Sequence, residues 1–164
     1  MCRTYSHVTT ALIFSVVCLS WMAPPARAGQ ANAPAACALL SRTDIEEAMA
    51  AAVSPGQHRL TIASASACRF TLDGGGVIAV VVRRPARPGW TAEQIARMLS
   101  YPQRFHEVSG IGDRSFLFDM TEKGAALCIF RADYYIQVSA FRVAQSSTLP
   151  PALAALARKV LARF

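Results

Sequence analysis

The sequence predicts an α+β domain: a five-stranded, mostly antiparallel sheet with helices packed on one face, in the order α-β-β-α-β-β-β-α. Three observations predict this fold. Apolar residues recur at helical spacing in three segments, each close behind a helix-capping residue. Five further segments are rich in β-branched and aromatic residues, as strands are. Tight turns join these strands into runs, which favours antiparallel pairing.

The first predicted helix starts at a capping-box pattern, Thr43-x-x-Glu46. In this pattern the threonine hydroxyl accepts a hydrogen bond from a backbone N–H that has no partner within the helix. The helix ends at Ser54-Pro55-Gly56. Its apolar residues recur at helical spacing and form one stripe, which consists of Ile45, Ala48, Met49 and Ala52.

A hairpin is predicted next. Apolar and polar residues alternate from 68 to 72, which indicates a half-buried strand. Asp73-Gly74-Gly75-Gly76 is the turn, because glycine adopts positive φ without steric cost. Residues 77–82 are apolar on both faces and predict a central strand. The arginines and prolines of 83–89 predict a loop, since proline cannot continue a hydrogen-bonded ladder.

The C-terminal half again begins with a capped helix. Thr91-x-x-Gln94 predicts its start and Pro102 its end. Three short strands joined by tight turns then predict a meander, at residues 115–118, 127–131 and 134–141. A last helix is expected after Ser146-Ser147-Thr148, with a proline in its first turn. Its apolar stripe consists of Leu153, Leu156, Val160 and Leu161.

Residues 1–28 predict a secretory signal peptide. Arg3 precedes an apolar run at residues 8–23, and Ala26-Arg27-Ala28 has the small-x-small pattern that signal peptidase cleaves. The run is too short, and too soon broken by proline, to predict a membrane span. We therefore expect an exported protein, periplasmic or secreted, that is not an integral membrane protein.

Cleavage after residue 28 leaves 136 of the 164 residues, which suits a flexible leader at 29–36 and a single domain at 37–164. Loss of Arg3 and Arg27 lowers the formal net charge from +7 to +5. A modest positive charge favours anionic partners in general. Export argues against nucleic acid. The expected partner is therefore an unknown protein or an anionic component of the cell envelope.

Five cysteines divide between the signal and the mature chain. Cys2 and Cys18 leave with the signal, so Cys37, Cys68 and Cys128 remain. We favour a Cys37–Cys68 disulfide, because Cys37 lies just ahead of the first helix and Cys68 in the first clear strand. A loop of that size contributes about 3–4 kcal/mol. A Cys68–Cys128 bridge stays open if those strands are neighbours. The valine before Cys18 does not favour lipidation.

Two stretches carry a family resemblance. Residues 37–46, with their Cys-Ala-Leu-Leu-Ser opening, and Cys68 resemble the start of a family of small secreted proteins and lipoproteins abundant in actinobacteria. Residues 108–116, with Gly-Ile-Gly-Asp, resemble a turn and strand of the same family, a domain of unknown function. The resemblance implies an exported α+β domain, a Cys37–Cys68 bridge and no established activity. It implies no catalytic residues.

No catalytic, cofactor or metal motif stands out in the chain. Cys128 with His58 or His106 would in principle make a Cys-dependent hydrolase, but burial within an apolar strand raises a thiol pKa and suppresses its reactivity. No Cys-x-x-Cys or His-x-x-x-His spacing predicts a metal site. Gly74-Gly75-Gly76 joins two strands and lacks the Gly-Lys-Ser/Thr of a phosphate loop. We expect no enzyme and no cofactor, with the Cys128 hydrolase as an alternative.

The predicted partner surface combines a basic loop with the sheet face opposite the helices. Arg83, Arg84 and Arg87 form the one basic cluster of the sequence, and Tyr135 begins the last strand. The uncovered sheet face is the expected place for binding. We therefore predict a non-catalytic envelope protein that binds a macromolecule or a small ligand. The alternative is an inhibitor or immunity-type protein that blocks an exported toxin or enzyme.

Overall fold

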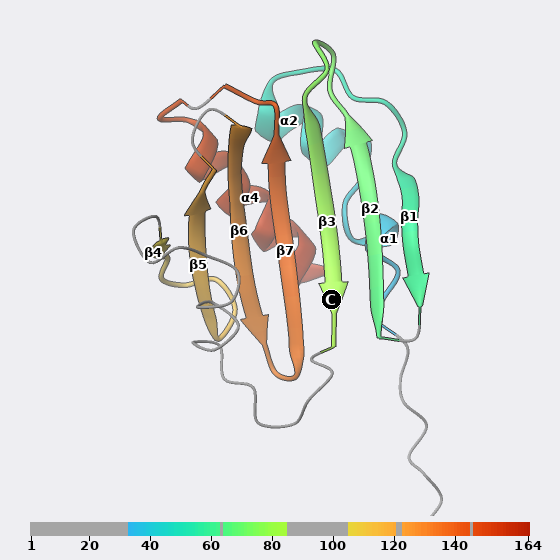
Figure 1. Cartoon of the computed structure of the whole chain (residues 1–164), viewed down its shortest axis with the longest axis vertical. Coiled ribbons are helices and arrows are strands. Elements are labelled where there is room, and N and C mark those ends of the chain that lie inside the picture. The colour runs from blue at the N-terminus through green and yellow to red at the C-terminus, as the bar shows by residue number, and fades with distance from the viewer. Residues whose placement is uncertain (1–32, 63, 85–104, 121–122, 145) are drawn as a thin grey trace, which may run out of the picture.

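The structure, a computed structural model, describes residues 33–62, 64–84, 105–120, 123–144 and 146–164. A seven-stranded antiparallel sheet in the order β1-β2-β3-β7-β6-β5-β4 forms its centre (Figure 1). The strands are β1 (Gln57–Ile62), β2 (Ala65–Thr71), β3 (Val77–Arg83), β4 (Phe105–Glu107), β5 (Arg114–Asp119), β6 (Gly124–Arg131) and β7 (Tyr134–Phe141). The described helices are α1 (Ala36–Leu39), α2 (Arg42–Met49) and α4 (Leu149–Ala162), and they lie behind the sheet in Figure 1.

The predicted fold, a five-stranded sheet with helices packed on one face, is wrong in its number of strands and in its order of elements. The sheet has seven strands, and the described helices are two short segments and one longer helix. The two missed strands, β1 and β4, form the edges of the sheet. All six residues of β1 are exposed and β4 has only three residues, so neither strand carries the alternation that marks a half-buried strand.

The hairpin and the meander are confirmed. β2 pairs with β3 without a register shift, from Ala65 opposite Arg83 to Thr71 opposite Val77. β5, β6 and β7 pair in sequence order. β7 then pairs with β3 and joins the two parts into one sheet. The predicted helix at 91–102, the signal at 1–28 and residues 29–32 of the leader lie outside the described residues and stay predictions.

The capping box of α2 involves other residues than predicted. Ser41 is the N-cap: its Oγ accepts the Asp44 N–H at 3.1 Å, and the Asp44 carboxylate accepts the Ser41 N–H at 2.8 Å. Two such patterns overlap in the sequence, and the earlier one forms the cap. Glu46, assigned to the predicted box, instead accepts the Val53 N–H at 3.2 Å and pairs with Arg42 at 2.7 Å.

The hydrophobic core lies between the sheet and the helices. Alternate residues of the central strands meet the apolar stripe of α4 and the short α1–α2 segment. The largest fully buried side chains are Ile45, Ile78, Val80, Val82, Ile111, Leu127, Ile129, Ile136, Val138, Leu153, Leu156 and Val160. None of the described helices combines the length and the apolar composition that crossing a membrane requires.

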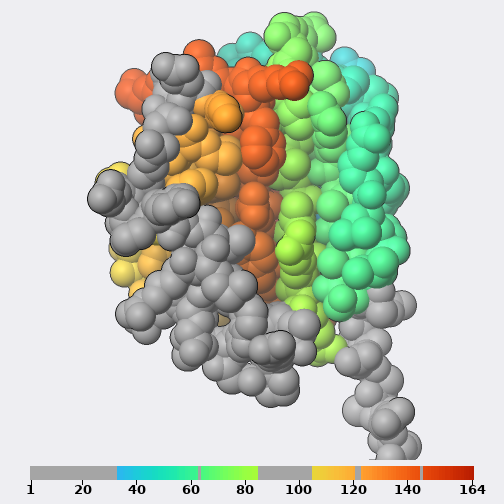
Figure 2. Space-filling view, in the orientation of Figure 1, coloured from blue at the N-terminus to red at the C-terminus, as the bar shows by residue number. Residues whose placement is uncertain are grey.

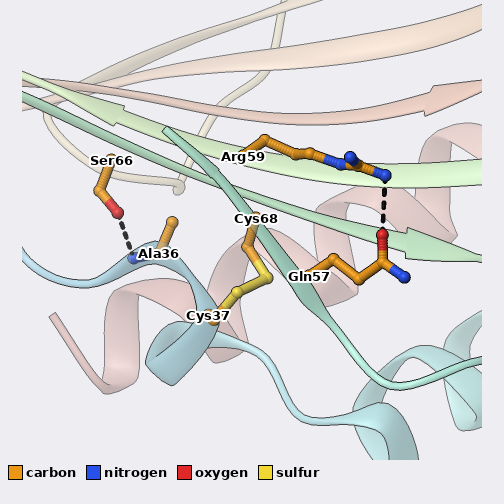
Figure 3. The surroundings of a disulfide bond; sticks show 6 residues. All are labelled: Ala36, Cys37, Gln57, Arg59, Ser66 and Cys68. Carbon is orange, nitrogen blue, oxygen red and sulfur yellow. Dashed lines mark hydrogen bonds between the residues drawn. A yellow bond between two sulfur atoms is a disulfide. The ribbon is translucent and has the colours of Figure 1, made fainter. Parts of the chain in front are cut away.

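A disulfide fixes α1 to the sheet. Cys37 of α1 and Cys68 of β2 are bonded, with their Cα atoms 5.0 Å apart, and next to them the Ala36 N–H donates to Ser66 Oγ at 2.9 Å (Figure 3). The favoured pairing is thus confirmed, and the Cys68–Cys128 alternative is excluded. Cys128 is free and buried.

Candidate functional site

The sheet has a front face, which points away from the described helices and toward the viewer in Figures 1 and 2. Side chains alternate between the faces along each strand. Because Cys68 and Phe70 of β2 belong to the helix-side core, Ala67 and Arg69 lie on the front. The ladder register extends this assignment to the neighbouring strands, where Ala79 of β3 lies opposite Arg69.

One part of the front face, over β5, β6 and β7, carries an aromatic cluster. Phe116, Phe130 and Tyr135 are buried there around Cys128, and Phe105 of β4 is half-buried against them. The Phe116 and Phe130 rings meet edge to face with centroids 6.2 Å apart, and the Phe130 and Tyr135 centroids are 5.5 Å apart. Such packing stabilises the fold and leaves no open binding surface at these side chains.

Cys128 in this cluster has the surroundings of a structural thiol. Its Sγ lies 3.3 Å from the Tyr135 hydroxyl, which also lies 2.8 Å from Gln137 Oε1. Burial raises the pKa of the Cys128 thiol and keeps it protonated at neutral pH. In the strand register, His58 of β1 lies opposite Cys68 and His106 of β4 lies opposite Leu117. Both histidines therefore occupy helix-side positions on the two edge strands. The predicted Cys–His pair is not brought together by the described residues.

The other part of the front face contains a hollow of about 280 Å³ over β1, β2, β3 and β7. We call it the arginine hollow. Three arginines from different parts of the chain line it, together with five apolar residues. Its lining consists of Arg59, Arg69, Arg142, Ala67, Cys68, Val77, Ala79 and Phe141. In Figure 2, strands β1 to β3 lie uncovered on this side of the molecule.

The charge of the arginine hollow is uncompensated by described residues. Arg59 donates from Nη2 to Gln57 Oε1 at 2.7 Å (Figure 3), a neutral partner. Arg69 and Arg142 form no ion pair with a described acid, and Arg69 Nε is buried without a hydrogen-bond partner. The described acids lie on α2, in turns, and on or beside β4 and β5: Asp44, Glu46, Glu47, Asp73, Glu107, Asp113, Asp119 and Asp133.

This arrangement is suited to anion recognition. A guanidinium group offers several N–H donors in one plane, which match the paired oxygens of a carboxylate, phosphate or sulfate. A buried donor without an acceptor costs about 1–3 kcal/mol, so an oxygen that lets Arg69 satisfy its donors would recover part of that cost.

The residues of the predicted partner surface lie in different surroundings. Arg83 is exposed on the front face at the end of β3, opposite Tyr135. Arg84 pairs with Asp133 at 2.6 Å and lies 5.3 Å from the Tyr134 ring centroid, so it serves the fold. Tyr135 is buried in the aromatic cluster. Arg87 lies outside the described residues.

Sequence reasoning missed the three arginines that line the hollow. Arg59 belongs to a strand that was not predicted, and Arg142 immediately follows β7. A signal did exist for Arg69: it alternates with Cys68 and Phe70, and therefore has to face away from the core.

A second hollow, of about 390 Å³, lies beside the start of α4 and includes serine, histidine and aspartate side chains. His106 is exposed and forms no hydrogen bond with the described residues that surround it. Ser146 Oγ lies 2.7 Å from Thr148 Oγ1 and not against the imidazole. The residue types of a catalytic triad are therefore present, but the described residues do not form with one another the contacts that define one. The lining residues are His106, Leu117, Asp119, Ala125, Ser146, Ser147, Leu149 and Pro150.

The described part of the chain contains no group of three His, Cys, Asp or Glu side chains placed to hold a metal ion. Comparison with protein-family models, with curated proteins and with solved structures gives no match for this chain.

Proposed function

We propose that the protein is an exported binding protein of the cell envelope, without a catalytic step of its own, that holds an anionic ligand in the arginine hollow. One observation carries the proposal. Arg59, Arg69 and Arg142 line a single hollow, and no described acid forms an ion pair with any of them. An unpaired arginine group of this kind is typical of sites for carboxylate, sulfate or phosphate.

The location of the arginines supports binding over a purely structural role. Arg84 and Arg42, which lie elsewhere, both pair with acids at 2.6–2.7 Å. The arginines that serve the fold are therefore paired with acids, whereas those of the hollow form no ion pair with a described acid and can bind an anion. Export is supported by the Cys37–Cys68 disulfide, because such bonds persist in oxidising compartments.

The test is a titration of the mature chain, residues 29–164, with sodium octanoate below its micelle concentration. Binding is followed by NMR through the amide signals of β2 and β3 and the Nε–H signals of the arginines. Arg69→Gln removes one guanidinium and is expected to weaken octanoate binding at least about tenfold, because charge-assisted hydrogen bonds are worth about 1.5–3 kcal/mol.

The matched control is Arg158→Gln. Arg158 is exposed on α4, on the opposite side of the sheet, and the same change removes the same charge there. It is expected to leave the affinity within about twofold, as distant exposed charges are screened by salt. Equal weakening by the two variants would show a diffuse charge effect and contradict the site. So would octanoate-induced shifts confined to residues outside the front face.

The geometry also bears on the catalytic alternative. A Cys128 hydrolase requires a thiolate beside a base, and the described histidines lie at helix-side positions while Cys128 lies on the front. Nothing in this geometry favours that alternative over binding.

A further inference from the structure

We infer that the ligand of the arginine hollow is a single-chain anionic amphiphile. Its acidic head group lies at Arg69 and Arg142, and its apolar chain runs along the front of β1, β2 and β3 toward Ile62. This inference rests on the proposed function, since it identifies the chemical class of the anion and the direction in which its body extends.

The exposed apolar side chains give the first argument. Among the described residues, the large hydrophobic side chains that are exposed are Leu60 at 38%, Ile62 at 53% and Phe141 at 37%. All three lie on the front face: Leu60 is opposite Ala67, Ile62 opposite Ala65, and Phe141 opposite Val77. Leu60 and Ile62 lie in the rows on one side of Arg69, and Phe141 lies in the row on its other side, so the face is basic at one place and apolar next to it.

The register shows how that surface is shaped. Successive cross-strand rows on β1, β2 and β3 read Gln57–Arg69–Ala79, then Leu60–Ala67–Val81, then Ile62–Ala65–Arg83. The middle strand contributes alanine in the last two rows, while larger side chains stand on both sides of it. A shallow trough with a methyl floor therefore leads away from Arg69 along β2. From residue 69 to residue 65 it is about 13 Å long, at roughly 3.3 Å per residue.

Charge decides the orientation of the ligand. Arg59, Arg69 and Arg142 lie at the start of the trough, so an acidic head group is favoured there. Leu60 and Val81 flank the middle, where only apolar atoms are buried without cost. Arg83 is exposed in the last row and marks the limit of the apolar floor. An extended chain that ends near this row fits, and a longer one reaches solvent.

Two other occupants fit less well. A bilayer surface would need apolar side chains that protrude together, whereas Phe141 lies in the row of Val77, on the other side of Arg69 from Leu60 and Ile62. An extended acidic peptide would pair with the free edge of β1, but the register of β1 shifts between His58 and Leu60. A bulge of this kind interrupts the regular ladder that an added strand requires.

The test is a chain-length series on the full mature chain: butyrate, octanoate and dodecanoate below their micelle concentrations, and octanol as the uncharged analogue. Affinity is expected to rise about two- to fourfold per methylene, since each CH₂ leaves water, and to stop rising once the chain passes Ile62. Octanol is expected to bind at least tenfold more weakly than octanoate.

Two variants separate the head from the tail. Ile62→Ser changes an exposed side chain of an edge strand, so the fold is retained, and unchanged thermal midpoints check this. It is expected to weaken dodecanoate about fivefold and leave butyrate unaffected. Arg69→Gln is expected to weaken both.

The outcomes distinguish the two proposals. If Arg69→Gln weakens binding but neither chain length nor Ile62→Ser has an effect, the amphiphile is refuted and the proposed anion site stands. If no anion of any length binds, the proposed function itself fails. Binding to vesicles of anionic phospholipid without binding of the monomers, or tighter binding of a peptide of alternating Asp and Val, would also overturn the inference.

Discussion

The carboxylate of Asp44 links the start of α2 to the end of α4 through ion pairs, and Asp44→Asn tests the contribution of these pairs to stability. The carboxylate is 8% exposed, accepts the Ser41 N–H at 2.8 Å, lies 3.0 Å from Lys159 Nζ and pairs with the Arg163 guanidinium. Asparagine keeps an acceptor oxygen for the cap and nearly the same shape. The substitution therefore removes the charge and little else.

The expected loss follows from burial. Breaking a fully buried ion pair costs about 3–5 kcal/mol, and an exposed pair contributes about 0–1 kcal/mol. Asp44 is buried, but the Lys159 and Arg163 side chains are 37% and 41% exposed. We therefore expect Asp44→Asn to lower the free energy of unfolding by about 1–3 kcal/mol. Glu47→Gln is the matched control, because Glu47 pairs with the same Lys159 but is 63% exposed, and it should cost less than about 1 kcal/mol.

The pH dependence separates charge from packing. The hydrogen bond from Arg163, with help from Ser41 and Lys159, holds the pKa of Asp44 well below its ordinary value of 3.8 despite burial. A lowered folded-state pKa stabilises the fold above the unfolded-state pKa, and this stabilisation is lost as the pH falls toward the folded-state value.

Urea unfolding of the wild type and both variants across pH measures this effect. The difference in the free energy of unfolding between the wild type and Asp44→Asn should be constant above about pH 5. Below the unfolded-state pKa of Asp44 this difference should decrease, by at most about 1.4 kcal/mol per pH unit. Equal losses for the two variants at neutral pH, or a difference that does not change down to about pH 2.5, would refute the reasoning.

Three further predictions concern the covalent and steric supports of the fold. Reduction of Cys37–Cys68, 31 residues apart, should lower the free energy of unfolding by about 3–4 kcal/mol in denaturant melts, and an unchanged midpoint would contradict this. Cys128 should react with iodoacetamide only after unfolding, because burial raises its pKa; rapid labelling of the native protein would revive the hydrolase. Gly112→Ala should destabilise much more than Gly110→Ala. Both glycines have positive φ, but only at Gly112 would a Cβ lie within 3 Å of other atoms. Equal melting temperatures for Gly112→Ala and Gly110→Ala would contradict this expectation.

Elements with strong local patterns were predictable from the sequence. The alternation that ends in Leu72, the glycine turn and the β-branched run after it define the β2–β3 hairpin. Tight turns likewise define the order of β5, β6 and β7. In both cases the pairing partners are neighbours in the chain, so the turn between them sets the register.

The remaining features depend on contacts between distant segments. β1 is exposed along its whole length and shows no alternation, so Arg59 could not be placed beside Arg69. The β3–β7 pairing has no local signal, and without it Arg142 has no assigned neighbour. Of the arginine hollow, only the orientation of Arg69 was open to prediction. The Arg84–Asp133 pair has no local signal either, because Asp133 lies in a turn 49 residues further along the chain.

The position of β7 has a consequence for how the chain acquires its structure. This strand lies between β3 and β6 in the middle of the sheet, yet it begins at residue 134 of 164. A polypeptide emerging N-terminus first can form the β2–β3 hairpin early, but its sheet stays in two pieces until the last fifth of the chain arrives. For the proposed export this delay is favourable, because a chain without a finished core is still extended enough to be threaded across a membrane.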